Sequence, residues 1–171
     1  AARFDGSRST ATVAGGLVVF NSGKKDERST YALDAETGET VWHVDGNKRF
    51  GGKSQGWGWN ASPLVWKDKV IVDLRTKDDE CPPLVALDLE TGDTVWTHDP
   101  SPGDLSAGDT SPQFAIKGDE RIVVHTAWRA VLGVDPESGK RLWRIKCSKG
   151  SILSPVYNDG YLLVGQDGHG G

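Results

Sequence analysis

The fold is decided by one stretch, Ala32-Leu33-Asp34-Ala35-Glu36-Thr37-Gly38-Glu39-Thr40-Val41-Trp42, which occurs three times in the chain. The second copy runs from Ala86 to Trp96 and reads ALDLETGDTVW, and the looser third copy runs from Gly133 to Trp143 and reads GVDPESGKRLW. Successive copies are 54 and 47 residues apart when counted between their tryptophans. Self-similarity at a period near 50 residues is typical of repeat architectures.

A second phrase, Ser-Pro, opens a short apolar run in each unit. It begins at Ser62, Ser111 and Ser154, and a degenerate copy begins at Thr10. A β-rich aliphatic run follows each copy, at residues 17–20, 70–72, 122–124 and 162–164. One unit therefore predicts four short strands separated by Gly, Asp and Asn turns, which is the pattern of an all-β protein. No stretch of ten or more residues has helical periodicity.

Each copy of the long phrase has the same three structural residues, an aspartate, a glycine and a tryptophan. They are Asp34, Gly38 and Trp42, then Asp88, Gly92 and Trp96, then Asp135, Gly139 and Trp143. The aspartate ends the third strand, where its carboxylate accepts N–H bonds from the turn. The glycine supplies the positive φ of a tight reversal. The tryptophan, on the fourth strand, buries ~150–250 Å² against a neighbour.

One four-stranded sheet cannot bury both of its faces alone, whereas a ring of such sheets can, and this is the β-propeller solution. The phrase Ala-x-Asp-x-x-Thr-Gly-x-x-x-Trp, coupled to Ser-Pro-x-Val, resembles the tryptophan-docking repeat of the PQQ-type (quinoprotein) β-propellers. That group includes quinoprotein alcohol dehydrogenases and BamB-like assembly lipoproteins. The resemblance implies an all-β propeller of four-stranded antiparallel blades, and because the motif is a packing motif it says little about function.

The 171 residues form a single partial propeller domain of about three and a half blades. We expect blades at about residues 9–45, 60–99 and 110–147 and a half blade at 152–171. Propellers close with four to eight blades, so we expect the chain to belong to a larger ring of seven or eight blades. The alternative is that two or more chains close one ring, to which residues 1–8 contribute at most one of the two strands that the half blade lacks.

Composition excludes several classes of protein. The net charge is −4 and 36% of the residues are hydrophobic. No apolar stretch approaches the ~18 residues of a membrane span, and the chain is not basic enough to suggest a nucleic acid partner. The two cysteines, Cys81 and Cys147, are either bridged or free thiols, and two cysteines do not settle the redox compartment.

Candidate binding residues lie on the connections that enter the first strand of each blade or join its second and third strands, since these share one face of a propeller. The connection at residues 46–60 is the most distinctive, with cations, an amide and two tryptophans among glycines, and an arginine beside a tryptophan follows a later strand. These candidates for ligand or partner binding are Lys48, Arg49, Lys53, Gln55, Trp57, Trp59, Asn60, Trp128 and Arg129. Trp and Arg are favoured in recognition surfaces. The alternative for the tryptophans is that they fill the gap between blades.

No catalytic residue and no metal ligand is assigned. A quinoprotein dehydrogenase of this family would hold PQQ and calcium beside a carboxylate base, and the alcohol dehydrogenases carry an adjacent Cys-Cys pair. This chain has no such pair, and its candidate carboxylates, Asp104, Asp109 and Asp167, are scattered. Calcium requires six to eight oxygen ligands. His43, His98 and His125 show no metal-ligand spacing and are interpreted as structural or surface residues.

We therefore expect a non-catalytic PQQ-like-repeat propeller, without a cofactor, that acts as a scaffold for protein interaction or ligand binding. Its partners are expected to be another protein or a small ligand at the loop face and the remaining blades of the ring, with no nucleic acid and no membrane span. The family resemblance implies a periplasmic or secreted location in a bacterium. The alternative is a fragment of a PQQ- and calcium-dependent alcohol dehydrogenase-type oxidoreductase.

Overall fold

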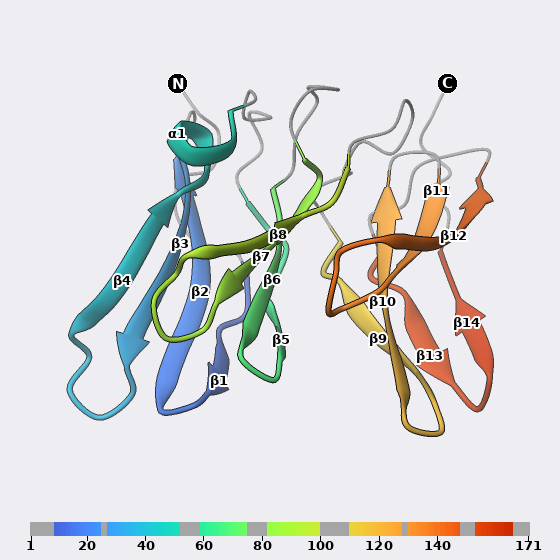
Figure 1. The fold of residues 1–171 in the computed structure, drawn as a ribbon, viewed down its shortest axis with the longest axis horizontal. Helices are drawn as coiled ribbons and strands as arrows, with labels where there is room; N and C mark the ends of the chain where they lie inside the picture. Colours follow the sequence, from blue (N-terminus) through green and yellow to red (C-terminus); the bar gives the residue numbers. More distant parts are fainter. Residues whose placement is uncertain are drawn as a thin grey trace.

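A computed structural model describes residues 9–24, 27–51, 59–74, 82–99, 110–127, 130–147 and 153–165. Three four-stranded antiparallel sheets and one two-stranded sheet follow one another along the chain and lie side by side (Figure 1). The all-β propeller prediction is confirmed. In each four-stranded sheet the strands pair in sequence order, so that every sheet is one blade of consecutive hairpins.

The blades have these strands. Blade 1 contains β1 (Thr12–Ala14), β2 (Leu17–Lys24), β3 (Glu27–Asp34) and β4 (Thr40–Asp45), and blade 2 contains β5 (Leu64–Trp66), β6 (Lys69–Asp73), β7 (Leu84–Asp88) and β8 (Thr94–Thr97). Blade 3 contains β9 (Gln113–Lys117), β10 (Glu120–Ala127), β11 (Ala130–Val134) and β12 (Arg141–Lys146). The two-stranded sheet contains β13 (Val156–Asn158) and β14 (Tyr161–Leu163).

Blade 2 is buried on both faces because blade 1 covers one face and blade 3 covers the other. Successive side chains of a strand point to opposite faces and therefore reach different neighbours. On β6, Val70 and Val72 belong to the core shared with blade 1, whereas Ile71 belongs to the core shared with blade 3. All three side chains are fully buried. The near-continuous apolar run of β6 therefore reflects neighbours on both sides of the sheet.

The turn between the third and fourth strands has the same geometry in blades 1, 2 and 3. In blade 1, Asp34 accepts hydrogen bonds from the backbone N–H groups of Glu36 and Thr37, at 3.0 and 2.7 Å, and from the Thr37 hydroxyl at 2.9 Å. Asp88 and Asp135 accept the equivalent bonds in their own turns. The following glycine has a positive φ of 72° to 73° in each turn. These contacts explain why the repeat keeps Asp, Thr or Ser, and Gly.

The Ser-Pro phrase makes a contact between blades that its sequence did not reveal. The backbone N–H of Ser62 donates to the Ser111 hydroxyl at 2.8 Å, and that of Ser111 donates to the Ser154 hydroxyl at 2.9 Å. Thr10, at the degenerate copy, donates its N–H to the Ser62 hydroxyl at 2.9 Å. A chain of hydrogen bonds, which we call the serine chain, thus runs in one direction from each blade to the next.

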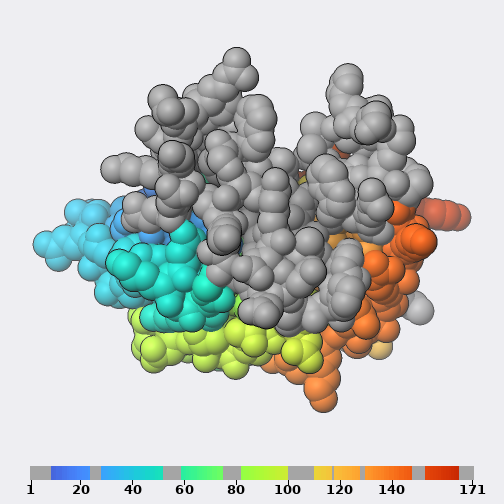
Figure 2. Space-filling view, turned by 90° about the horizontal axis from the view of Figure 1, so that it is seen from above, coloured from blue at the N-terminus to red at the C-terminus, as the bar shows by residue number. Residues whose placement is uncertain are grey.

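Among the described residues, one helix lies between the sheets. The α1 helix (Gly46–Phe50) follows β4 directly, and Asp45 caps it by accepting a hydrogen bond from the Lys48 N–H at 3.1 Å. It lies at the opposite end of the blades from the turns that join the first and second strands (Figure 1). Seen from above, α1 and the outermost strands β8 and β12 lie along one edge of the molecule (Figure 2). No described helix is long and apolar enough to cross a membrane.

Candidate functional site

The tryptophans of blades 1 and 2 bind the turn of the following blade. Trp42 Nε1 donates to the carbonyl of Leu89 at 2.9 Å, and Trp96 Nε1 donates to the carbonyl of Pro136 at 3.1 Å. Each ring also covers a turn glycine: a Cβ built on Gly92 would lie 2.8 Å from Trp42, and one on Gly139 would lie 2.5 Å from Trp96. Each junction therefore requires a glycine under the tryptophan ring.

Trp143 has different surroundings from the other two tryptophans. It is half-buried, and its indole lies over Gly133 of its own sheet, where an added Cβ would come within 2.1 Å of the ring. Its neighbours on β12 include the exposed side chains of Leu142 and Ile145. The outer strand of blade 3 thus exposes two large apolar side chains among the cations Arg141, Arg144 and Lys146.

The candidate cations of α1 have different roles. Lys48 is 86% exposed and pairs with Asp45 at 3.1 Å. The hydrogen bonds from Lys48 lower the pKa of the Asp45 carboxyl against the opposing effect of desolvation. Arg49 Nη1 donates instead to the carbonyl of Gly92 at 2.6 Å, which is the glycine covered by Trp42. Arg49 therefore joins α1 to blade 2, whereas the Lys48 side chain extends into solvent.

Arg28 was not among the candidate residues, yet it joins α1 to blades 1 and 2. Its side chain is 1% exposed. It donates to the Asn47 side chain, to the carbonyl of Leu74 in blade 2, and to the carbonyl of Gly51 at 2.7 Å. A guanidinium suits this position because its fixed fork of donors satisfies several acceptors together.

Trp59 and Asn60 lie beneath this end of the blades. Trp59 is 1% exposed, packs in the core shared by blades 1 and 2, and donates its Nε1 to the carbonyl of Asp73 at 2.9 Å. Asn60 is half-buried and leads into the first strand of blade 2. Trp59 thus occupies the interior, as in the alternative in which the tryptophans fill the gap between blades.

The remaining candidates lie outside the described residues. They are Lys53, Gln55, Trp57, Trp128, Arg129, the carboxylates Asp104, Asp109 and Asp167, and Cys81. Cys147 is a free, half-buried thiol.

A buried acid and histidine face each other between blades 2 and 3. Oδ2 of Asp73, at the end of β6, lies 3.7 Å from Nδ1 of His125 on β10, and both side chains are fully buried. His98 is also buried, whereas His43 is exposed and stacks on Tyr31 with ring centroids 4.4 Å apart. Among the described residues, no group of three or more His, Cys, Asp or Glu side chains is placed to hold a metal ion.

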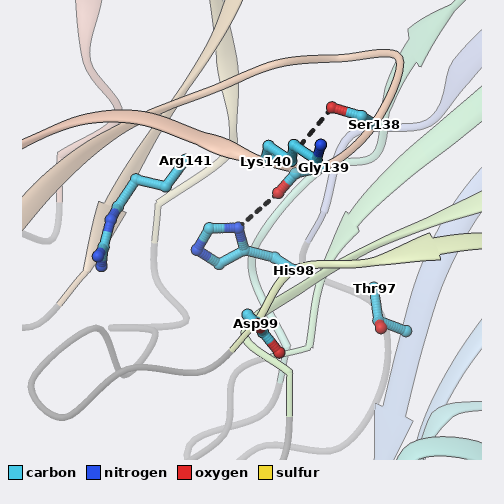
Figure 3. Close-up of a pocket in the computed structure, with 7 residues that line it drawn as sticks. All are labelled: Thr97, His98, Asp99, Ser138, Gly139, Lys140 and Arg141. Carbon is cyan, nitrogen blue, oxygen red and sulfur yellow. Dashed lines mark hydrogen bonds between the residues drawn. The ribbon is translucent and has the colours of Figure 1, made fainter.

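A recess of about 410 Å³ lies at the outer edge of the junction between blades 2 and 3 (Figure 3). It is lined by the end of β8 with the two residues that follow it, and by the start of β12 with the three residues that precede it. These residues are Thr97, His98, Asp99, Ser138, Gly139, Lys140 and Arg141. His98 Nδ1 lies 2.7 Å from the carbonyl oxygen of Gly139. Because a carbonyl only accepts, this nitrogen carries the proton.

In the same junction, Glu137, which directly precedes Ser138 of the recess, binds three side chains of blade 2. Its carboxylate accepts from Lys67, from Lys69 at 3.0 Å and from Trp66 Nε1 at 3.2 Å. These hydrogen bonds lower the pKa of Glu137 to about 2, and the bond from Lys67 has the largest effect. In the junction between blades 1 and 2, Glu90 occupies the position of Glu137, but Gly15 and Leu17 stand where blade 2 has Lys67 and Lys69.

The chain resembles known proteins at the level of both sequence and structure. The family model described as outer membrane protein assembly factor BamB matches residues 83–170. The quinoprotein ethanol dehydrogenase of Pseudomonas putida is 32% identical over 117 residues, which are 63% of this chain and 18% of that protein. BamB from Moraxella catarrhalis superposes with a TM-score of 0.65 at 21% identity, over 95% of this chain and 47% of that one.

A second solved structure, the quinohemoprotein alcohol dehydrogenase from Comamonas testosteroni, superposes with a TM-score of 0.58 at 23% identity. The match covers 83% of this chain and 21% of that one. This chain thus spans less than half the length of each of these relatives. The family model covers about half of the chain, and the blades, turns and junctions agree with it. The chain belongs to the PQQ-repeat β-propeller family that includes the outer membrane assembly factor BamB.

Proposed function

We propose that the chain is part of a non-catalytic propeller that acts as a scaffold for protein interaction or ligand binding in the bacterial cell envelope. One observation carries the proposal. Two of the described candidates for binding at the α1 end hold blades together: Arg49 binds the carbonyl of Gly92, and Trp59 is buried against blade 2. The groups at this end are those of a rigid support rather than of a reaction centre.

The partners in this proposal follow from the exposed surfaces. A protein or a small ligand would bind the loop face, where Lys48 is presented. Further blades of the ring would cover Leu142 and Ile145 of β12, and Trp143 would dock on the turn of the next blade as Trp42 and Trp96 do on theirs. The BamB-like relatives support a periplasmic or secreted location.

The second candidate function is that of a PQQ- and calcium-dependent alcohol dehydrogenase-type oxidoreductase. It is favoured by the 32% identity with the quinoprotein ethanol dehydrogenase. The described residues supply no group of three acidic or histidine ligands. In this reading, calcium and PQQ would be held by carboxylates elsewhere in the protein, and Asp104, Asp109 and Asp167 would be the first to test.

The two functions are separated by titrating the full protein with PQQ in the presence and absence of Ca²⁺, following the thermal midpoint and the PQQ absorbance. A scaffold gives no shift of the midpoint at saturating PQQ. Calcium-dependent binding that raises the midpoint would overturn the scaffold proposal; such binding stabilises the folded protein by RT ln(1 + [L]/Kd), about 2.7 kcal/mol at a hundredfold excess over Kd. Asp104→Asn, Asp109→Asn and Asp167→Asn would then identify the carboxylates involved.

A further inference from the structure

Four aspartates of the chain are followed directly by glycine. This pair of residues favours attack of the glycine nitrogen on the aspartate side chain, because glycine has no Cβ to hinder the approach. The pairs Asp45-Gly46 and Asp159-Gly160 lie in the described residues, and Asp5-Gly6 and Asp167-Gly168 lie outside them. The two described pairs differ in every contact that would oppose such an attack.

Asp159 and Gly160 form the turn between β13 and β14, at the end of the sheets opposite α1 (Figure 1). Both residues are exposed, and so is Tyr161 beside them, to 76%. No hydrogen bond or ion pair reaches the Asp159 carboxylate in the described part of the chain. The turn aspartate of blade 1, Asp34, accepts three hydrogen bonds by comparison. The Asp159 side chain is therefore free to approach the Gly160 nitrogen.

The backbone of this turn is strained at the same residue. Asp159 has a φ of +46°, and Lys67 is the other described residue besides glycine with a positive φ. This conformation is unfavourable for an L residue, although aspartate tolerates it better than most. Lys67 occupies the equivalent turn of blade 2, where its side chain is held by Glu137. Asp159 has no such support, so its turn opens locally at low cost.

Asp45 and Gly46 are held on both sides instead. The Asp45 carboxylate accepts from the Lys48 N–H at 3.1 Å and pairs with the Lys48 ammonium at 3.1 Å. Gly46 is buried at the start of α1, where an added Cβ would lie 3.1 Å from the carbonyl oxygen of Arg28. Attack at this pair would break the cap of α1 in a packed region. The structure therefore protects one Asp-Gly pair and leaves the other accessible.

We propose that Asp159 is a modification site, at which the aspartate converts spontaneously to isoaspartate. The Gly160 nitrogen attacks Cγ of the protonated carboxyl group and forms the N–Cγ bond. The Cγ–OH bond breaks, and the hydroxyl leaves with the amide proton as water. A second water then adds to the α-carbonyl carbon of the resulting succinimide and breaks the bond from that carbon to the Gly160 nitrogen. The main chain then passes through Cβ and Cγ of residue 159, and the α-carboxylate is free.

The conversion adds one carbon atom to the backbone of the turn. Asn158 and Tyr161 pair across β13 and β14, and the loop between them has two residues. Hairpin register depends on the length and type of such a loop. Isoaspartate at residue 159 should therefore loosen the pairing of β13 with β14. The inference holds whether the propeller is a scaffold or a dehydrogenase.

The test is incubation of the full protein at neutral pH in H₂¹⁸O, followed by digestion in ordinary water and peptide mapping by mass spectrometry. We expect the peptide that contains residue 159 to gain one ¹⁸O and to include an isoaspartate isomer. Asp45 should convert roughly tenfold more slowly, the factor expected for release of one hydrogen bond to a charged group. A synthetic peptide of residues 157–162 gives the rate without the fold. Conversion of the peptide but not of Asp159 in the protein, or equal rates at Asp45 and Asp159, would overturn the proposal.

Asp159→Gly is the matched control, because blade 1 has Gly15 and Gly16 at the same turn with φ values of +58° and +76°. This variant retains the two-residue turn and has no carboxyl group to attack. After incubation, amide hydrogen exchange in β13 and β14 should be faster in the wild type and unchanged in Asp159→Gly. An equal change in both proteins would show that isoaspartate does not loosen the hairpin and would overturn that part of the proposal.

Discussion

At the scale of single residues, the turn glycines carry two constraints that differ between blades. Gly38 and Gly92 have the same φ of +73°, a conformation that an L residue adopts only with strain. The described part of the chain places nothing within 4 Å of a Cβ at Gly38, whereas a Cβ at Gly92 would meet the Trp42 ring. Substitutions at Gly38 and Gly92 therefore distinguish the cost of backbone strain, which both share, from the cost of a clash with tryptophan, which only Gly92 has.

We expect Gly38→Ala to lower the free energy of unfolding by ~1–2 kcal/mol, the cost of a left-handed backbone. Gly92→Ala should lower it by a further ~1–3 kcal/mol, because the Trp42 ring must move out of contact with its turn. Urea denaturation of the two variants measures the difference. Equal losses of unfolding free energy in the two variants would show that a side chain at Gly92 does not clash with the Trp42 ring.

Glu137 should make stability depend on acidity. Its pKa in the folded protein is about 2, below the ordinary 4.5, because the lysines and Trp66 stabilise the carboxylate. The stabilisation is therefore complete above about pH 4.5 and is lost as the pH falls towards 2. We expect Glu137→Gln to remove this part of the acid dependence of the thermal midpoint.

The control for Glu137 is Glu36→Gln, which removes a carboxylate from the equivalent turn of blade 1 and leaves the contacts of Lys67 and Lys69 intact. It should retain the wild-type slope between pH 4.5 and 2. If Glu137→Gln also retains that slope, the ion pairs between blades 2 and 3 contribute nothing to stability.

At the scale of elements, the first strands are tied by the serine chain. Ser111→Ala removes the acceptor of the Ser62 N–H and should lower the free energy of unfolding by ~1 kcal/mol, the net value of one hydrogen bond. Ser111→Thr keeps the hydroxyl, as Thr10 does at the same place in blade 1, and should be close to wild type. Thermal denaturation of both variants tests this, and similar midpoints for the two would argue against the hydrogen bond.

The strands and turns were predictable from the sequence because their causes are local. Asp88, Thr91 and Gly92 make a turn through contacts within five residues. The α1 helix was not predictable, since five residues give too short a period to detect and its support comes from Arg28 in an earlier strand. The use of Arg49 was also missed, because its acceptor, Gly92, is 43 residues away.

The recess at His98 shows the same limit. The sequence indicated only a structural or surface histidine, and the choice of partner depends on Gly139 in the next blade. A repeat aligned on its tryptophans gives one signal, because Val44 and His98 occupy equivalent positions with different chemistry. A polar residue at a position that another blade fills with valine indicates a junction with different hydrogen bonds.

At the scale of the whole molecule, burial is greatest in the middle blade and falls towards the last sheet. Every residue of β6 is buried, whereas Val156 and Leu163 of the two-stranded sheet are 58% and 69% exposed. We expect amide hydrogen exchange to be slowest in β6 and β7 and fastest in β13 and β14, because opening of the last sheet exposes little new surface. Uniform protection along the chain would contradict this gradient.

The direction of the serine chain has a consequence for how such proteins change in size. Each blade offers an N–H to the blade that follows and a hydroxyl to the blade that precedes it. A duplicated blade therefore adds one N–H donor and one hydroxyl acceptor, and a deleted blade removes one of each. Gain or loss of a whole repeat leaves the serine chain matched, so this set of hydrogen bonds is no obstacle when gene duplication or unequal recombination lengthens or shortens the ring.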